Sequence, residues 1–185
     1  MVQRNLRGVM IECMRGDIAH QPDVDAVVNA ANAQLSTGGG VAGAIHRAAG
    51  PGLASECQAF APIRPGQAVI TGAHGLPNRF VIHCLGPVYG RDEPADELLA
   101  ACYRNALRLA TQDDVTSLAF PAISTGAFGY PLETAAEVAV RAVVESVLED
   151  AIKVVGLIRF VLFDAHAERV FCDTVARLVP ESPSP

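Results

Sequence analysis

The sequence predicts an α/β fold, a three-layer α/β/α sandwich with helices on both faces of a mixed central sheet. Apolar runs that suit buried strands alternate along the chain with segments of helical spacing. The chain has 185 residues, half of them hydrophobic, which suffices for a substantial core. We expect one domain at 1–179 and a disordered, Pro/Ser-rich tail at 180–185.

The first half of the chain is expected to start with an irregular segment at 1–7 and a strand of alternating residues at 8–14. The apolar run at 24–28 suits a buried strand. After three glycines the spacing becomes helical up to Gly50, and Pro51 opens a short helix that ends near residue 59.

The remaining elements alternate in the same way and are separated by Pro, Gly and Asn residues typical of turns. The expected strands are 67–73, 79–85, 117–123 and 157–164, and the expected helices are 95–111, 131–150 and 165–178. Ligands of such folds sit beyond the carboxyl ends of strands. Because both glycine-bearing loops and the turn at Asp17 follow strands, we expect them to meet at one edge of the sheet.

The glycines at 38–40 and the loop at 124–130 both follow an expected strand and precede an expected helix. Glycine lets the backbone approach a ligand, and the free N–H groups of a helix N-terminus favour an anion. The pattern therefore favours a phosphate or diphosphate site. Plain strand-to-helix loops also contain such glycines, and neither GxxxxGK[ST] nor GxGxxG is present.

Composition limits the other function classes. The formal net charge is −6, which disfavours a broad nucleic-acid surface because Lys and Arg hold phosphate backbones. Five cysteines without a CxxC pair indicate buried reduced thiols rather than a disulfide framework or a zinc site. No signal-like or membrane-spanning apolar run is present, so we expect a cytoplasmic protein without a membrane partner.

Five motifs in order resemble those of the macrodomain family, whose members bind ADP-ribose. They are Gly16-Asp17-Ile18, VVNAAN at 27–32, GGGVAGAIHRAAGP at 38–51, VIHCLGPVYG at 81–90 and FPAISTGAFGYP at 120–131. They are most similar to the MacroD-type branch. Members of that branch remove ADP-ribose from acidic side chains and deacetylate O-acetyl-ADP-ribose. The resemblance implies the macrodomain form of the α/β/α sandwich.

The resemblance also implies roles for individual residues. Asp17 would accept a hydrogen bond from the adenine amino group, although an Asp after a Gly is also a common helix N-cap. Phe163 would stack on adenine and Phe128 would pack on the distal ribose, although core packing is the usual fate of Phe. Asn32 would orient the distal ribose for hydrolysis and is the expected catalytic residue. Asn29 is expected to tie the loop to the backbone.

The full set of expected ligand-binding residues combines these positions with the two glycine loops. It consists of Asp17, Ile18, Asn32, Gly39, Gly40, Val41, Ala42, Ser124, Thr125, Gly126, Ala127, Phe128 and Phe163. No cofactor and no metal are expected. The expected partners are ADP-ribose or its esters, and ADP-ribosylated proteins.

One position departs from the family pattern. MacroD-type hydrolases carry an aspartate that positions or activates water two residues after the last glycine of the first loop, and this chain has Ala42 there. General-base assistance typically contributes about 10²–10⁴-fold. His46 lies one helical turn further on and is a second candidate base, although a helical His is more often structural.

Two hypotheses therefore remain for the function. The first is a hydrolase of ADP-ribosyl esters, either mono-ADP-ribosylated Asp or Glu or O-acetyl-ADP-ribose. The second is a module that binds ADP-ribose with little or no turnover because of Ala42. RNA or poly-ADP-ribose binding is a third class, which the acidic balance of charge disfavours.

Overall fold

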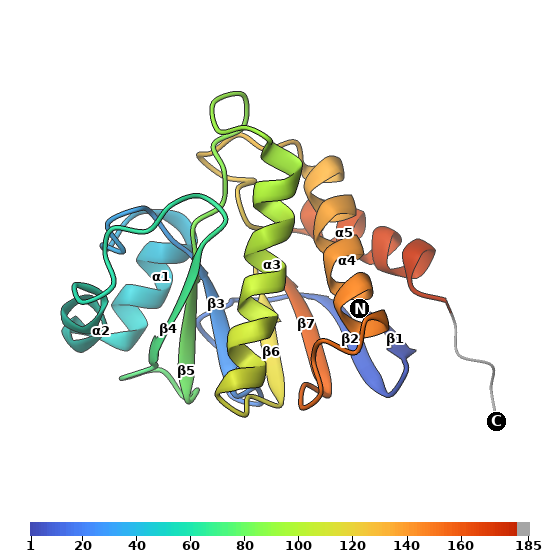
Figure 1. The fold of residues 1–185 in the computed structure, drawn as a ribbon, viewed down its shortest axis with the longest axis horizontal. Coiled ribbons are helices and arrows are strands. Elements are labelled where there is room, and N and C mark those ends of the chain that lie inside the picture. Colours follow the sequence, from blue (N-terminus) through green and yellow to red (C-terminus); the bar gives the residue numbers. More distant parts are fainter. Residues whose placement is uncertain (181–185) are drawn as a thin grey trace.

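The structure is a computed structural model that describes residues 1–180, and it forms a seven-stranded mixed sheet between two helical layers (Figure 1). The strands are β1 (Val2–Leu6), β2 (Val9–Arg15), β3 (Ala26–Ala30), β4 (Ala68–Gly72), β5 (Phe80–Cys84), β6 (Ser117–Phe120) and β7 (Leu157–Leu162). The helices are α1 (Gly40–Ala49), α2 (Pro51–Cys57), α3 (Ala95–Gln112), α4 (Leu132–Leu148) and α5 (Ala165–Leu178). The predicted three-layer architecture is confirmed.

The order of strands in the sheet is β1-β2-β7-β6-β3-β5-β4. The five inner strands run parallel, and β1 and β4 pair antiparallel at the two edges. Parallel strands place all their carboxyl ends at one edge of the sheet. The segments after β3, β5 and β6 accordingly lie together at the upper edge in Figure 1.

The two faces of the sheet carry separate apolar clusters. The larger cluster packs α3, α4 and α5 on one face, and includes the fully buried Tyr103, Phe120, Phe160 and Phe171. The smaller cluster packs α1 and α2 on the other face, around Ile45 and Leu53.

The prediction of an irregular start at 1–7 was wrong. Residues 2–6 form the edge strand β1, which joins β2 through a two-residue turn at Arg7 and Gly8. Both turn residues have positive φ, 50° and 89°, as a type I′ hairpin turn requires. The strand was not predicted because residues 3–5 are polar, and an edge strand can carry polar side chains outward.

Three further elements have boundaries that differ from the predictions. The strand expected at 24–28 is β3 at Ala26–Ala30, because the Asp25 carboxylate instead accepts hydrogen bonds from Thr116 in a loop. The strand expected at 117–123 stops at Phe120, because Pro121 has no N–H to donate to a ladder. The helix expected to open at Pro131 begins at Leu132. The tail predicted at 180–185 lies outside the described residues, apart from residue 180.

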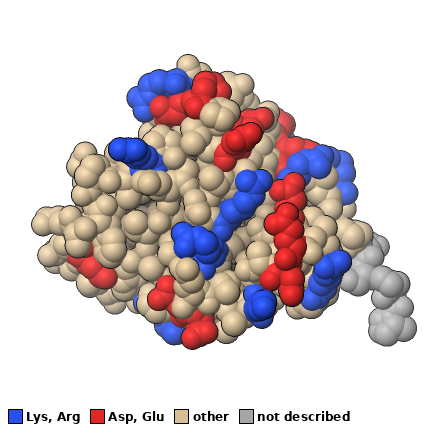
Figure 2. Space-filling view, in the orientation of Figure 1, with Lys and Arg blue, Asp and Glu red and all other residues tan. Residues whose placement is uncertain are grey.

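Charged side chains of both signs are interleaved on the face shown in Figure 2. Arg104 on α3 and Glu145 on α4, for example, pair at 3.2 Å across the two neighbouring helices. Within residues 1–180, no helix combines the length and apolar character needed to cross a bilayer. The five cysteines are free thiols and buried, as predicted.

Candidate functional site

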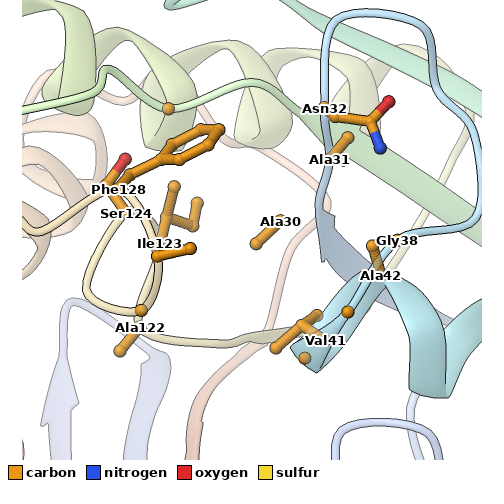
Figure 3. A pocket seen from close by; sticks show the side chains of 15 residues that line it. Ala30, Ala31, Asn32, Gly38, Val41, Ala42, Ala122, Ile123, Ser124 and Phe128 are labelled. Atoms are coloured by element: carbon orange, nitrogen blue, oxygen red, sulfur yellow. The ribbon is translucent and has the colours of Figure 1, made fainter.

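A cavity with a volume of about 300 Å³ lies at the carboxyl edge of the sheet. Segments after β3, β5 and β6 and the start of α1 form its walls. Figure 3 shows Phe128, Ile123 and Ser124 on one side, with Asn32, Val41 and Ala42 on the opposite side. The lining residues are Ala30, Ala31, Asn32, Gly38, Gly39, Gly40, Val41, Ala42, Gly86, Ala122, Ile123, Ser124, Gly126, Ala127 and Phe128. None of these lining residues, all within the described part of the chain, carries a charged side chain.

The first wall is the N-terminus of α1. Gly39 is its N-cap residue and provides no side-chain cap, so the first N–H groups of the helix remain available to a ligand. Gly40 has φ +53°, a conformation that L residues rarely adopt. Gly43 lets the helix approach the loop, because an added Cβ there would lie 2.5 Å from the carbonyl oxygen of Gly38. The start of α1 therefore offers backbone N–H donors beside the cavity without a charged side chain.

Asn32 closes the loop that leads from β3 to α1. Its Oδ1 accepts hydrogen bonds from the Ser36 N–H and hydroxyl at 3.1 and 3.2 Å, and its Nδ2 donates to the Ser36 carbonyl at 2.9 Å. An amide oxygen has two lone pairs and an amide nitrogen has two hydrogens. The side chain therefore retains one N–H donor for a group in the cavity.

The second wall is the loop after β6. Ser124 has φ +67° and its hydroxyl is buried without a protein partner, which is costly unless a ligand or water satisfies it. Thr125 points elsewhere and donates from Oγ1 to the carbonyl of Ala122 at 2.9 Å. Gly86 allows the loop after β5 to meet this wall, since an added Cβ would lie 2.1 Å from the Ser124 hydroxyl. The loops after β5 and β6 are therefore closely packed against each other.

Aromatic residues frame this second wall. Phe128 is half-buried against the smaller cluster and lines the cavity. Tyr130 is buried and donates from its hydroxyl to the Asp96 carboxylate. Its ring packs against that of Tyr89, with the ring centroids 4.9 Å apart and the ring planes inclined by 58°. Of the two aromatic residues in this loop, Phe128 lines the cavity and Tyr130 does not.

Asp17 and Phe163 lie beside each other at the same edge of the sheet, outside the cavity. They follow the carboxyl ends of β2 and β7, which pair through Arg15 and Leu162, and the Gly16 N–H donates to the Leu162 carbonyl at 2.9 Å. Phe163 is 89% exposed, so the alternative that it is a core residue was wrong. An exposed aromatic ring and a carboxylate therefore follow the ends of two paired strands.

The Asp17 carboxylate forms a local turn. Its Oδ1 accepts from the Ala19 N–H at 2.9 Å and its Oδ2 contacts His20 Nδ1 at 2.8 Å. No helix begins at this turn within the described chain, so the N-cap alternative was wrong. Partial burial raises the pKa of Asp17, but the hydrogen bonds from Ala19 and His20 lower it by a larger amount. The net shift of the pKa is downward. The side chain is an ionised acceptor at neutral pH.

The comparisons with known proteins identify the family. The model of the Macro domain family matches residues 28–139, more than half of the chain. The chain belongs to the macrodomain family. The O-acetyl-ADP-ribose deacetylase of Salmonella typhimurium is 47% identical over 166 residues, which cover 87% of this chain and 91% of that protein.

Two solved structures show that relatives of this macrodomain hold nucleotides. The Oceanobacillus iheyensis macrodomain with ADP has a TM-score of 0.91 and 36% identity, covering 96% of each chain. The Trypanosoma brucei macrodomain in complex with ADP-ribose has a TM-score of 0.83 and 35% identity, covering 92% of this chain and 70% of the other.

The macrodomain brings together nine of the expected ligand-binding residues and leaves four outside the cavity. Asn32, Gly39, Gly40, Val41, Ala42, Ser124, Gly126, Ala127 and Phe128 line it, and Asp17, Ile18, Thr125 and Phe163 do not. Ile18 is buried in the smaller cluster. The apolar residues Ala30, Ala31, Gly86, Ala122 and Ile123 were not expected in the site. Their position at or just after the carboxyl ends of strands was the signal that could have placed them there.

A buried polar cluster lies beneath the macrodomain's first loop. Asn29 is buried, as a structural role requires, but its Nδ2 donates to His83 Nδ1 at 3.1 Å and not to the backbone. The Thr71 hydroxyl donates to the Gly72 carbonyl, so it accepts from His83 Nε2–H at 2.9 Å. Burial, with a contribution from His46, lowers the pKa of His83 to about 3. His83 is therefore a neutral interior residue.

His46 and the thiols are poor candidates for chemistry. His46 is buried, neither of its ring nitrogens has a protein partner, and it does not line the cavity. Burial lowers its pKa. Burial likewise raises the pKa of the Cys57 thiol to about 11, which disfavours a thiolate nucleophile at neutral pH.

Proposed function

We propose that this macrodomain binds ADP-ribose along the carboxyl edge of its sheet. The observation that carries the proposal is the linear arrangement of complementary groups over adjacent parallel strands. Asp17 and Phe163 lie after β2 and β7, and the uncharged cavity lies beside them after β6 and β3. The macrodomains of known structure with ADP and ADP-ribose support the choice of ligand.

Each part of ADP-ribose has a matching feature. Adenine would stack on the exposed Phe163 ring and donate from its amino group to the Asp17 carboxylate. The diphosphate would lie between the N-terminus of α1 and the loop at 124–128, where backbone N–H groups need no Lys or Arg to hold an anion. The distal ribose would reach Asn32 and Phe128 across the cavity.

We further propose that the bound substrate is an ADP-ribosyl ester and that the protein hydrolyses it. Its substrates would be mono-ADP-ribosylated Asp or Glu side chains, or O-acetyl-ADP-ribose. Water adds, the ester bond breaks, and the products are ADP-ribose and the free carboxylic acid. The one free N–H of Asn32 would orient the distal ribose while a phosphate oxygen of the ligand accepts the proton of water. The 47% identical deacetylase supports this reaction class.

A second candidate function, ADP-ribose binding with little turnover, is favoured by Ala42. Its methyl group occupies the cavity wall at the place where the hydrolases of the branch carry a carboxylate, and no Asp or Glu replaces it among the described lining residues. Without that carboxylate a base contribution of about 10²–10⁴-fold is missing. ADP-ribosylated proteins would then be partners rather than substrates.

Calorimetric titration with ADP-ribose, followed by a hydrolysis assay on a glutamate-ADP-ribosylated protein, separates these functions. Turnover that falls at least about tenfold in Asn32→Ala supports the hydrolase. Binding without turnover, together with turnover gained in Ala42→Asp, supports the binding module. Absence of ADP-ribose binding contradicts both. The cytoplasmic location and the single domain at 1–179 stay predictions.

A further inference from the structure

An arginine lies buried in the sheet, away from the cavity. Arg159 is the third residue of β7 and is only 8% exposed. Its neighbours in the strand, Ile158 and Phe160, face the larger cluster, whereas Leu157 and Val161 contact the smaller one. Because side chains alternate along a strand, Arg159 shares the face of Leu157 and Val161. The loop that follows β2 covers it there.

Four hydrogen bonds hold the Arg159 guanidinium. Its Nε donates to Glu12 on the neighbouring strand β2 at 2.8 Å. Its Nη1 and Nη2 donate to the two carboxylate oxygens of Asp23, each at 2.8 Å, and Nη1 also donates to Gln21 Oε1 at 3.0 Å. The fork geometry of arginine thereby connects the sheet to two residues of one loop.

Gln21 extends this connection to the Asp17 turn. It is 5% exposed, and its Nε2 donates to the backbone carbonyl of Asp17 at 2.9 Å. The same nitrogen packs against Gly16, where an added Cβ would lie 3.3 Å from it. A continuous path of hydrogen bonds therefore runs from Arg159 through Gln21 to the residue whose carboxylate faces adenine in the proposed complex.

Stability alone does not account for this network. Replacing a buried ion pair by apolar residues of similar volume is often neutral or stabilising, because the charges lose their hydration. Apolar residues at 157, 158, 160 and 161 show that this part of β7 accepts them. The turn at Asp17 contains no helix or strand that would fix its orientation. Hydrogen bonds can restrain its direction, whereas apolar contacts cannot.

We propose that Arg159 and Gln21 are positioning residues for recognition of the base, and the inference rests on the proposed function. Arg159 holds Gln21, Gln21 holds the Asp17 carbonyl, and the Asp17 carboxylate is thereby aimed at the amino group of adenine. The network thus sets specificity for a purine that carries a 6-amino group over one that carries a 6-carbonyl, and does not touch the ligand.

The test compares the affinities of ADP-ribose and inosine diphosphate ribose, measured by calorimetry on the same preparations. The test variant is Gln21→Leu, which keeps the Arg159 pairs with Glu12 and Asp23. Its preference for ADP-ribose over inosine diphosphate ribose is expected to fall by about three- to tenfold, the value of one hydrogen bond. Arg159→Lys, which cannot span the same partners, is expected to shift the ratio in the same direction.

Gln3→Leu is the matched control. Gln3 Nε2 donates at 2.8 Å to Glu12 Oε1, the carboxylate oxygen that Arg159 does not contact, so its loss removes a hydrogen bond to Glu12 without breaking the path to Asp17. Its base preference is expected to equal that of the unmodified protein, whereas Asp17→Asn defines full loss of preference. If the unmodified protein prefers ADP-ribose and Gln21→Leu keeps that ratio, the inference is overturned and the proposed function stands. If ADP-ribose does not bind at all, both fail.

Discussion

At the scale of the residue, Phe163 is the position where structure changed the interpretation most. Its place at the end of an apolar strand is typical of a core residue, like Phe160 three positions earlier. The chain instead leaves β7 before Phe163, and Asp164 caps α5 by accepting from the Ala167 N–H at 2.8 Å. The ring is left in solvent, at the end of the strand that pairs with the one preceding Asp17.

Phe163→Ala tests this position. Because the ring is 89% exposed, its loss should leave the thermal midpoint of unfolding within about 1 °C. Stacking on a base is worth about 1–3 kcal/mol, so the dissociation constant for ADP-ribose should rise about 5- to 150-fold in calorimetry. Phe60→Ala, which removes another exposed ring (41% exposed), should bind as the unmodified protein does. Equal binding by Phe163→Ala and Phe60→Ala contradicts the adenine placement.

At the scale of the element, the strand-to-loop junctions decided how much the sequence could predict. Helical and strand spacing placed most elements within a few residues, and α5 at the predicted 165–178. The glycine motifs also indicated both walls of the cavity. The lining residues Ala30, Ala31 and Ala122 were not predicted because they carry no functional group, and the parallel pairing of β3 and β6 brings them to the same edge of the sheet. Hydrogen-bond partners such as Ser36 for Asn32 likewise depend on loop geometry.

Glycine replacement should have opposite effects in the loop after β6, which contains Gly126, and in the loop after β5, which contains Gly86. A Cβ at Gly126 meets nothing within 4 Å, so Gly126→Val should keep the fold and fill the cavity. We expect ADP-ribose affinity to fall at least about tenfold with the unfolding midpoint nearly unchanged. Gly126 tests the site better than Gly40, whose positive φ would add backbone strain.

Gly86→Val is the counterpart. Its Cβ would lie 2.1 Å from the Ser124 hydroxyl and 2.6 Å from Ile123 Cγ2, so the loops must separate. Thermal unfolding should show destabilisation of about 1–3 kcal/mol. Unimpaired ADP-ribose binding by Gly126→Val would place the diphosphate elsewhere, whatever the result for Gly86→Val.

At the scale of the whole molecule, the buried His83 couples stability to pH. Burial lowers its pKa from 6.5 to about 3 in the folded state, and burial also lowers the pKa of His46. A histidine with a depressed folded pKa contributes its full stability above pH 6.5, and loses it as pH falls because the unfolded chain takes up the proton first. The loss in free energy of unfolding is about 1.4 kcal/mol per pH unit for one such histidine.

Urea unfolding at pH 7.5 and pH 5.0 should therefore show a loss of about 2 kcal/mol from His83, with His46 acting in the same direction. Carboxylates with lowered pKa, such as Asp23 and Asp25, lose their contributions only at lower pH, near the ordinary value of 3.8 and below. His83→Asn should be less stable at pH 7.5 but show a smaller loss on acidification, whereas the exposed His20→Ala should keep the full loss. If the unmodified protein, His83→Asn and His20→Ala lose the same free energy of unfolding on acidification, the acid sensitivity belongs to groups other than His83.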